Sequence, residues 1–150
     1  MKFEDFMIGQ TYETATYRMT KEKIQGFAQE FDPQYMHLDE EKASLSSFGG
    51  IIASGMHTLN VSFRMWIDVG MYGDDIVAGR GMDKLVFRKA VFPEDELSVK
   101  VVVTEKKLLK HGQGLVTVKM TTYNQHEEKV LTASLSAIMK TKKRTIDHEK

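Results

Sequence analysis

The chain has 150 residues, contains no cysteine and carries 21 basic and 21 acidic side chains, so its formal net charge is zero. This length fits one ordinary domain that can bury a hydrophobic core without disulfides or metal ions. The lack of cysteine excludes disulfide frameworks, thiolate metal sites and cysteine nucleophiles. The balanced charge, without a basic stripe, argues against a protein that binds nucleic acid.

The first residues, MKFEDFMIGQTYE, include acidic side chains and no continuous apolar run, which is unlike a signal peptide. No stretch of the chain approaches the roughly 20 apolar residues that a membrane helix needs. We therefore expect a cytoplasmic protein that does not enter membranes. Residues 1–140 are predicted to form one domain, and residues 141–150 a charged C-terminal tail.

The first third of the chain predicts an extended arm followed by small helices. Residues 10–18 are rich in Thr and Tyr and favour a strand or extended arm. Residues 21–31 predict an amphipathic helix that Thr20 caps, with apolar side chains at helical spacing. Pro33 ends this helix at Asp32, because proline disfavours the helical conformation of the residue before it. Residues 32–39 are then expected to form a loop, and residues 40–45 a short helical turn.

The strongest pattern covers residues 52–70, IASGMHTLNVSFRMWIDVG. It predicts a helix with an apolar stripe that should be buried over most of its circumference; the stripe consists of Ile52, Met56, Leu59, Phe63 and Trp66 or Ile67. Ser54 is a plausible N-cap, and a helix start of this kind leaves the amides of Gly55 and its neighbours free.

The remaining chain favours four strands, at residues 83–92, 96–105, 114–124 and 129–139, because apolar and β-branched side chains alternate there. The connections between these strands are too short for helical crossovers, so the pairing should be antiparallel. A curved antiparallel sheet wrapped around one long apolar helix buries both elements. The sequence thus predicts the α+β class and the hot-dog fold, with a homodimer formed across a two-fold axis.

Asp32 and His37 are the first candidates for chemistry, because a carboxylate and an imidazole in one turned loop can bind a water and transfer its protons. On spacing alone a helix-capping role for Asp32 is the stronger interpretation. Asp39 beside His37 also suggests a metal, but zinc sites need three or four ligands, and we expect none. His57 is interpreted as a hydrogen-bonded core or helix-surface histidine.

The start of the long helix is a candidate oxyanion site. Unpaired amides and the helix dipole at Ser54 and Gly55 would stabilise negative charge on a carbonyl oxygen. A nucleophilic Ser54 is the rival interpretation, but Ile52 occupies the position where a nucleophile elbow has glycine. Ordinary helix capping by Ser54 is compatible with an oxyanion role of the neighbouring amides.

Residues 27–58, FAQEFDPQYMHLDEEKASLSSFGGIIASGMHT, resemble the signature of the MaoC-like dehydratases, a family that includes R-specific enoyl-CoA hydratases. The family's Asp, the His five residues later and the Gly-Met at the start of the central helix match Asp32, His37 and Gly55-Met56. Residues 85–97, LVFRKAVFPEDEL, resemble its Arg-containing strand and Pro turn. The likeness spans roughly residues 3–140.

This resemblance implies that Asp32 and His37 hold a water and add it to a trans-2-enoyl thioester, giving an (R)-3-hydroxyacyl product. The amide of Gly55 would polarise the thioester carbonyl. It implies no metal or redox cofactor, and an acyl-CoA or acyl-carrier-protein substrate. Gln34 and Tyr35 replace the family's Asn-Pro, so they, with Ser54 and Met56, are the predicted substrate-binding residues. A hot-dog thioesterase and a non-catalytic acyl-CoA-binding module remain alternatives.

Overall fold

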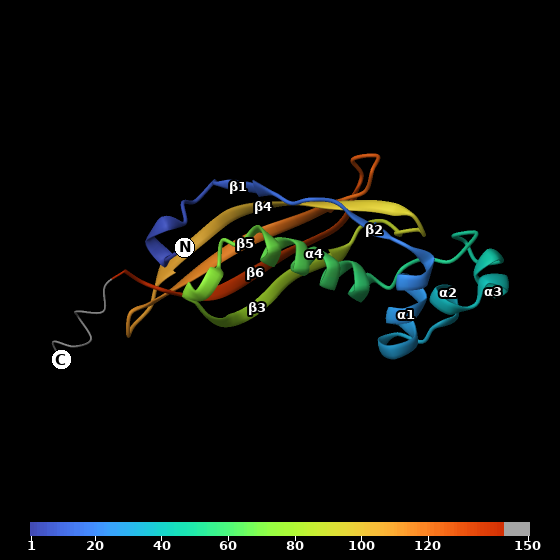
Figure 1. The fold of residues 1–150 in the computed structure, drawn as a ribbon, viewed down its shortest axis with the longest axis horizontal. Helices are drawn as coiled ribbons and strands as arrows, with labels where there is room; N and C mark the ends of the chain where they lie inside the picture. Colours follow the sequence, from blue (N-terminus) through green and yellow to red (C-terminus); the bar gives the residue numbers. More distant parts are fainter. Residues whose placement is uncertain (143–150) are drawn as a thin grey trace.

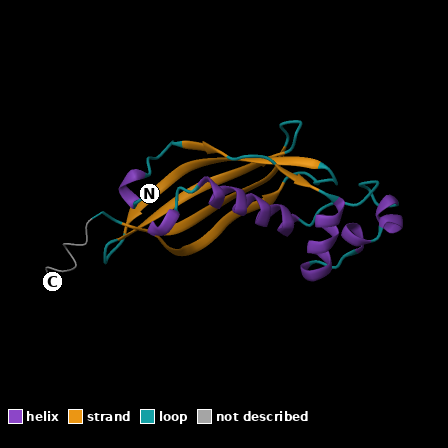
Figure 2. Cartoon of the chain, in the orientation of Figure 1, coloured by secondary structure: helices purple, strands orange, loops and turns teal. Residues whose placement is uncertain are grey.

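The structure is a computed structural model that describes residues 1–142 of the chain. A sheet with antiparallel pairing runs in the order β1-β4-β5-β6-β3, and β2 pairs with β4 beyond this path. The strands are β1 (Thr11–Glu13), β2 (Tyr17–Met19), β3 (Ile76–Phe87), β4 (Asp95–Leu108), β5 (Gln113–Tyr123) and β6 (Lys129–Lys140). The long helix α4 (Gly55–Val69) lies along one face of this sheet (Figures 1 and 2). The predicted α+β hot-dog architecture is confirmed.

The core lies between α4 and the inner face of the sheet, and strand alternation explains its composition. The inward side chains of the three central strands are buried, namely Leu97, Val99, Val101 and Val103 on β4, Val116, Val118 and Met120 on β5, and Leu131, Ala133, Leu135, Ala137 and Met139 on β6. Trp66 of α4 is 1% exposed beneath this layer. A short bond of 2.6 Å between the Ser62 and Thr122 hydroxyls satisfies two buried polar groups there.

Helix α4 begins and ends where its sequence dictates. The Ser54 hydroxyl accepts the amide of Met56 at 3.2 Å, and Gly70 closes the helix in the left-handed region at φ +86°. The predicted stripe is only partly correct. Ile52 lies before the helix, and Met56, Phe63 and Ile67 are 48%, 40% and 38% exposed. The polar residues Thr58 and Ser62 are buried instead, and the Ser62 hydroxyl contacts the Thr122 hydroxyl on the sheet and donates to the Thr58 carbonyl of its own helix.

Three small helices gather at the end of the molecule where α4 begins (Figure 1). They are α1 (Lys21–Phe31), α2 (Tyr35–Leu38) and α3 (Glu40–Ser44). Thr20 caps α1 and the short helix α3 forms, both as predicted. The prediction of a loop over residues 32–39 is wrong in its second half. Pro33 stops α1 but does not restrain the residues after it, so Tyr35–Leu38 form one helical turn, closed by a bond from Asp39 N–H to the Tyr35 carbonyl.

Strand β3 differs most from the sequence prediction of residues 83–92. It begins at Ile76 and ends at Phe87, and its pairing with β6 contains three register shifts. Gly79 and Gly81 weaken the strand pattern at its start, but an edge strand needs only one partner. Residues 88–92 leave the sheet for a turn in which the carboxylate of Asp95 accepts the amide of Phe92 at 2.9 Å.

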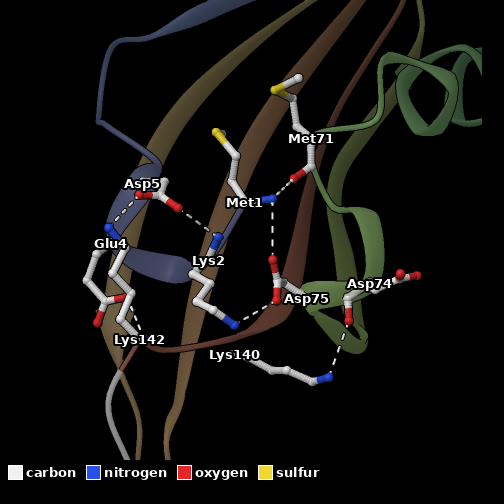
Figure 3. A network of polar contacts seen from close by, with 9 residues as sticks. All are labelled: Met1, Lys2, Glu4, Asp5, Met71, Asp74, Asp75, Lys140 and Lys142. Atoms are coloured by element: carbon white, nitrogen blue, oxygen red, sulfur yellow. Dashed lines mark hydrogen bonds and ion pairs between the residues drawn. The ribbon is translucent and has the colours of Figure 1, made fainter.

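A polar network ties the N-terminus to the end of the sheet opposite α1, next to the helical turns η1 (Phe3–Asp5) and η2 (Gly73–Asp75) (Figures 1 and 3). The ammonium of Met1 donates to the Met71 carbonyl at 2.6 Å, and Lys2 Nζ lies 2.8 Å from Asp75 Oδ1. The hydrogen bond from Lys2 is also the main reason why the pKa of Asp75 lies below its ordinary value. The backbone of Lys142 bonds to Glu4 nearby.

Most of the predicted tail, residues 143–150, lies outside the described residues. Within residues 1–142, the longest helix has 15 residues, and none is both long and apolar enough to cross a bilayer.

Candidate active site

Asp32 and His37 meet at the junction of α1 and α2. The Nε2 atom of His37 lies 3.2 Å from Oδ2 of Asp32. Asp32 ends α1 through its backbone, whose N–H donates to the Ala28 carbonyl at 2.8 Å. The helix cap therefore does not occupy the carboxylate, which remains available to His37. The two residues that the sequence pattern paired are brought together.

The backbone of Ile52 fixes the His37 ring. The Nδ1 atom of His37 lies 2.7 Å from the carbonyl oxygen of Ile52, while the Ile52 amide donates to the Met36 carbonyl at 3.0 Å. A carbonyl oxygen can only accept, so Nδ1 carries a proton and Nε2 is the atom that faces Asp32. The His37 side chain is 7% exposed, so this orientation is held in a buried setting.

The carboxyl of Asp32 is biased toward its charged form. Hydrogen bonding from Ser54 and then from Gln34 lowers its pKa below the ordinary value, and burial opposes this effect only in part. The Gln34 amide donates to Asp32 Oδ1 at 2.5 Å. Asp32 is therefore a carboxylate at neutral pH, with one oxygen toward Gln34 and the other toward His37.

The amide of Gly55 is the free donor at the start of α4. The amides of His57 and Thr58 donate to the Ser54 carbonyl, and that of Met56 donates to the Ser54 hydroxyl. Among residues 1–142, no acceptor is bonded to the amide of Gly55. A free N–H at the first position of a 15-residue helix combines a hydrogen-bond donor with the positive end of the helix dipole.

His37 and Gly55 line one open, mainly apolar cleft of about 580 Å³. Its other walls come from α2, the turn before α4, the end of β3 and the segment after β3; they include Met36, Phe48, Ala53, Phe87, Val91 and Phe92. The Phe87 ring packs directly on Gly55, and the ring is part of a residue that is 52% exposed. The cleft thus places His37 and a free amide beside apolar walls, an arrangement typical of a small-molecule site, while Asp32 does not line the cleft but contacts it through His37.

The other predicted substrate-binding residues have different positions. Gln34 and Ser54 do not line the cleft but support Asp32 through hydrogen bonds. Tyr35 and Met56 are about half exposed, at 49% and 48%, and do not line it either.

Sequence reasoning missed the cleft residues of the segment 87–92. The alternation predicts a strand that includes Phe87 and Phe92, and Arg88 stands out only within the family-like pattern of residues 85–97. Two phenylalanines flanking a break in strand alternation were the signal that could have identified this wall.

His57 is buried beside the site but is not part of the cleft. Its ring stacks on Phe27 at 4.6 Å, and no partner for its Nδ1 is found in the described part of the chain. The predicted core location is correct, but the predicted hydrogen bond is missing at this atom. Burial, followed by the nearby charge of Lys23, lowers the pKa of His57 to about 4. Across residues 1–142, His, Asp and Glu form no group of three that could ligate a metal.

Comparisons with known proteins identify the family and support the fold. The model of the family described as MaoC like domain matches residues 4–126. An uncharacterized protein of Bacillus subtilis, YdeM, is 50% identical over 140 residues, which are 93% of this chain and 99% of that protein. The MaoC-like dehydratase of Rhodospirillum rubrum superposes with a TM-score of 0.84 at 32% identity, over 95% of this chain and 99% of that one. The R-hydratase PhaJ1 of Pseudomonas aeruginosa superposes with a TM-score of 0.72 at 25% identity, over 95% and 86% of the two chains.

Proposed function

This chain belongs to the MaoC-like domain family, and from that membership we propose that it hydrates a trans-2-enoyl thioester to an (R)-3-hydroxyacyl thioester, or catalyses the reverse reaction. The observation that carries the proposal is the contact of 3.2 Å between His37 and Asp32 beside a cleft that the free amide of Gly55 also lines. The similarity to an R-hydratase supports the choice of reaction. Residues 1–140 are the proposed catalytic domain.

The reaction starts from a protonated His37 paired with the Asp32 carboxylate. Asp32 removes a proton from water as the water oxygen bonds to C3 of the substrate. The electron pair of the C2–C3 double bond moves toward the thioester oxygen, where the Gly55 amide stabilises the enolate. As the enolate collapses, C2 takes the proton of His37 Nε2. The proton on Asp32 then returns to Nε2 across the 3.2 Å contact, which restores the starting state.

Each group suits its assigned role. The lowered pKa of Asp32 keeps a base available at neutral pH. The Ile52 carbonyl occupies Nδ1, so Nε2 is the only ring nitrogen that can exchange a proton with the substrate. The steps use only groups of this chain and water, and so they need neither a metal nor a redox cofactor.

The test is a hydration assay with crotonyl-CoA and longer enoyl-CoAs. The loss of absorbance of the conjugated thioester measures the rate. We expect turnover, and a fall of kcat by about 10²–10⁴-fold in Asp32→Asn and in His37→Gln. Ser44→Ala is the matched control, since Ser44 is exposed and its hydroxyl donates to the Glu41 carbonyl of its own helix. Absence of hydration across chain lengths would refute the proposal. Release of free CoA from saturated acyl-CoA would instead favour a thioesterase, and binding without turnover a non-catalytic acyl-CoA-binding module.

We further propose a homodimer, or a higher homo-oligomer, in the cytoplasm. Strand β3 is a sheet edge whose exposed residues include Val77, Met82 and Val86. The exposed Met56, Phe63 and Ile67 form a stripe on α4, which we call the α4 stripe. A second copy that pairs with the β3 edge would cover apolar groups and unsatisfied backbone groups together.

A further inference from the structure

A second hollow, of about 380 Å³, lies against the face of the sheet opposite α4. Because inward side chains such as Val118 and Leu135 alternate with outward ones, Lys119 and Ser134 project to the opposite face. The lining is polar and rich in hydroxyl groups, comprising Thr104, Thr117, Thr132, Ser134 and Ser136 together with charged side chains. Hydroxyl groups and cations together are the donors that a phosphate ester requires.

Arg88 lines both this hollow and the cleft that contains His37. It follows Phe87, whose ring packs on Gly55, so it stands where the chain passes from the cleft wall to the outer face. Its Nε donates to the Thr132 hydroxyl at 3.1 Å. Among residues 1–142, no carboxylate pairs with its guanidinium, so the two terminal nitrogens keep their donors for a ligand. Lys89, in contrast, is held by Glu128 at 2.5 Å.

Two more cations line the hollow, and one of them has an unusual backbone. Neither Lys84 nor Lys119 makes an ion pair with any residue from 1 to 142. Lys84 has φ +53°, in the left-handed region, beside a register shift between Asp83 and Val86. A non-glycine residue in this conformation is strained, and strain of this kind gathers at functional sites.

The hollow also contains two acidic residues, and the cations outnumber them. Asp83 and Glu105 line it as well. The Asp83 carboxylate accepts the Lys84 amide at 2.8 Å, so one of its oxygens is already engaged. Three cations against two carboxylates leave a local excess of positive charge in a chain whose formal net charge is zero.

We propose that this hollow binds the phosphate ester at the end of the substrate's pantetheine arm, with Arg88 as its principal donor. The inference rests on the proposed function, which requires a thioester at Gly55. Arg88 lines both hollows, so an arm that leaves the Gly55 amide would pass from one hollow to the other beside this side chain. CoA and acyl carrier protein both carry this phosphate, so the site would recognise either carrier by the chemistry that they share.

The experiment compares the wild type and one variant on a series of substrates that differ in how much of the carrier they retain. Hydration is measured for crotonyl-pantetheine, which lacks the phosphate, for crotonyl-phosphopantetheine, and for crotonyl-CoA and crotonyl-acyl carrier protein. We expect Arg88→Gln to lower kcat/KM for each phosphate-bearing substrate roughly tenfold more than for crotonyl-pantetheine, because one charge-assisted bond is lost. Lys119→Gln should give a smaller loss of the same pattern. Arg18→Gln is the control, since Arg18 is exposed and lines neither hollow.

The outcomes separate this inference from the proposed function. If the wild type hydrates none of the four substrates, the proposed function fails. If it hydrates them and Arg88→Gln lowers all rates equally, or lowers only the rate with crotonyl-CoA, the shared phosphate is not the ligand and the inference is overturned. If the loss appears with all three phosphate-bearing substrates, the carrier with the higher wild-type kcat/KM is the source of the phosphate.

Discussion

The ring of Phe87 occupies the space that a side chain at Gly55 would need. A Cβ atom built on Gly55 would lie 2.6 Å from the Phe87 ring atoms Cε2 and Cζ, closer than real Cβ contacts. Position 55 therefore has two requirements, a free amide and no side chain. The requirement for no side chain arises from the half-exposed Phe87 ring, and a mutation can remove that ring.

We predict that Gly55→Ala lowers both kcat/KM and thermal stability, since the methyl group must displace the ring; overpacking of this kind costs about 1–3 kcal/mol. The double variant Gly55→Ala, Phe87→Ala should relieve the clash, so that its melting temperature equals that of Phe87→Ala alone. Gly26→Ala is the matched control. No atom lies within 4 Å of a Cβ at this position of α1, so alanine there should stabilise the protein by about 0.5–1 kcal/mol. Equal effects of the two glycine substitutions would contradict the assignment.

The pH profile of hydration should report on Ser54. The hydrogen bond from Ser54 is the largest cause of the lowered pKa of Asp32. Without that donor the charged form is less favoured, so the pKa of Asp32 rises and the carboxylate is protonated at higher pH. We therefore predict that Ser54→Ala moves the acidic limb of log kcat/KM against pH toward higher pH. Gln34→Ala should act in the same direction and by less. An unmoved acidic limb in both variants would show that Asp32 is not the group that titrates there.

His57 should make the fold sensitive to acid. Burial lowers its folded-state pKa to about 4, while an unfolded histidine titrates near ~6.5. The unfolded state therefore binds more protons between these values, and this stabilising contribution is present above about pH 6.5 and lost as pH falls toward 4. The slope should reach at most ~1.4 kcal/mol per pH unit. Urea unfolding of His57→Leu as a function of pH should lack this component. His126→Gln, at an exposed turn, should retain it.

The α4 stripe gives a prediction for assembly. Phe63→Glu places a charge in the apolar surface that a second copy would cover, so it should shift the protein toward a monomer. The measurement is the mass by light scattering during size exclusion. Arg64→Ala changes a neighbouring side chain that is 75% exposed and, within residues 1–142, pairs only with Asp68, so it should leave the mass unchanged. A monomeric wild type at assay concentration would contradict the proposed dimer.

The sequence predicts the elements of this fold where one physical signal dominates. Alternation located β4, β5 and β6 to within three residues at each end, and Thr20 and Ser54 marked two helix starts. The signal failed where local preference yields to tertiary pairing. The edge strand β3 contains Gly79 and Gly81, and its residues 76–82 become a strand only because β6 lies beside them.

The site was predicted less completely than the fold. The spacing of Asp32 and His37 and the start of α4 indicated groups that do meet around one cleft. The partners that orient them come from backbone atoms, such as the Ile52 carbonyl, and no side-chain pattern encodes these contacts. The wall formed by Phe87 and Arg88 depends on where β3 ends, which the sequence misplaced. Tyr35 and Met56 are predicted from positions of the family-like pattern, and neither lines the cleft.

The backbone of Ile52 holds His37 through its carbonyl and Met36 through its amide, and every amino acid carries that carbonyl. The orientation of the His37 ring is consequently insensitive to which side chain stands at position 52, so long as the buried apolar space is filled. Proline is the exception, because it retains the carbonyl but lacks the amide that donates to Met36. Substitutions at this position should thus be tolerated according to side-chain volume. In a saturation library, only proline should disturb the backbone bonds that hold His37 and Met36.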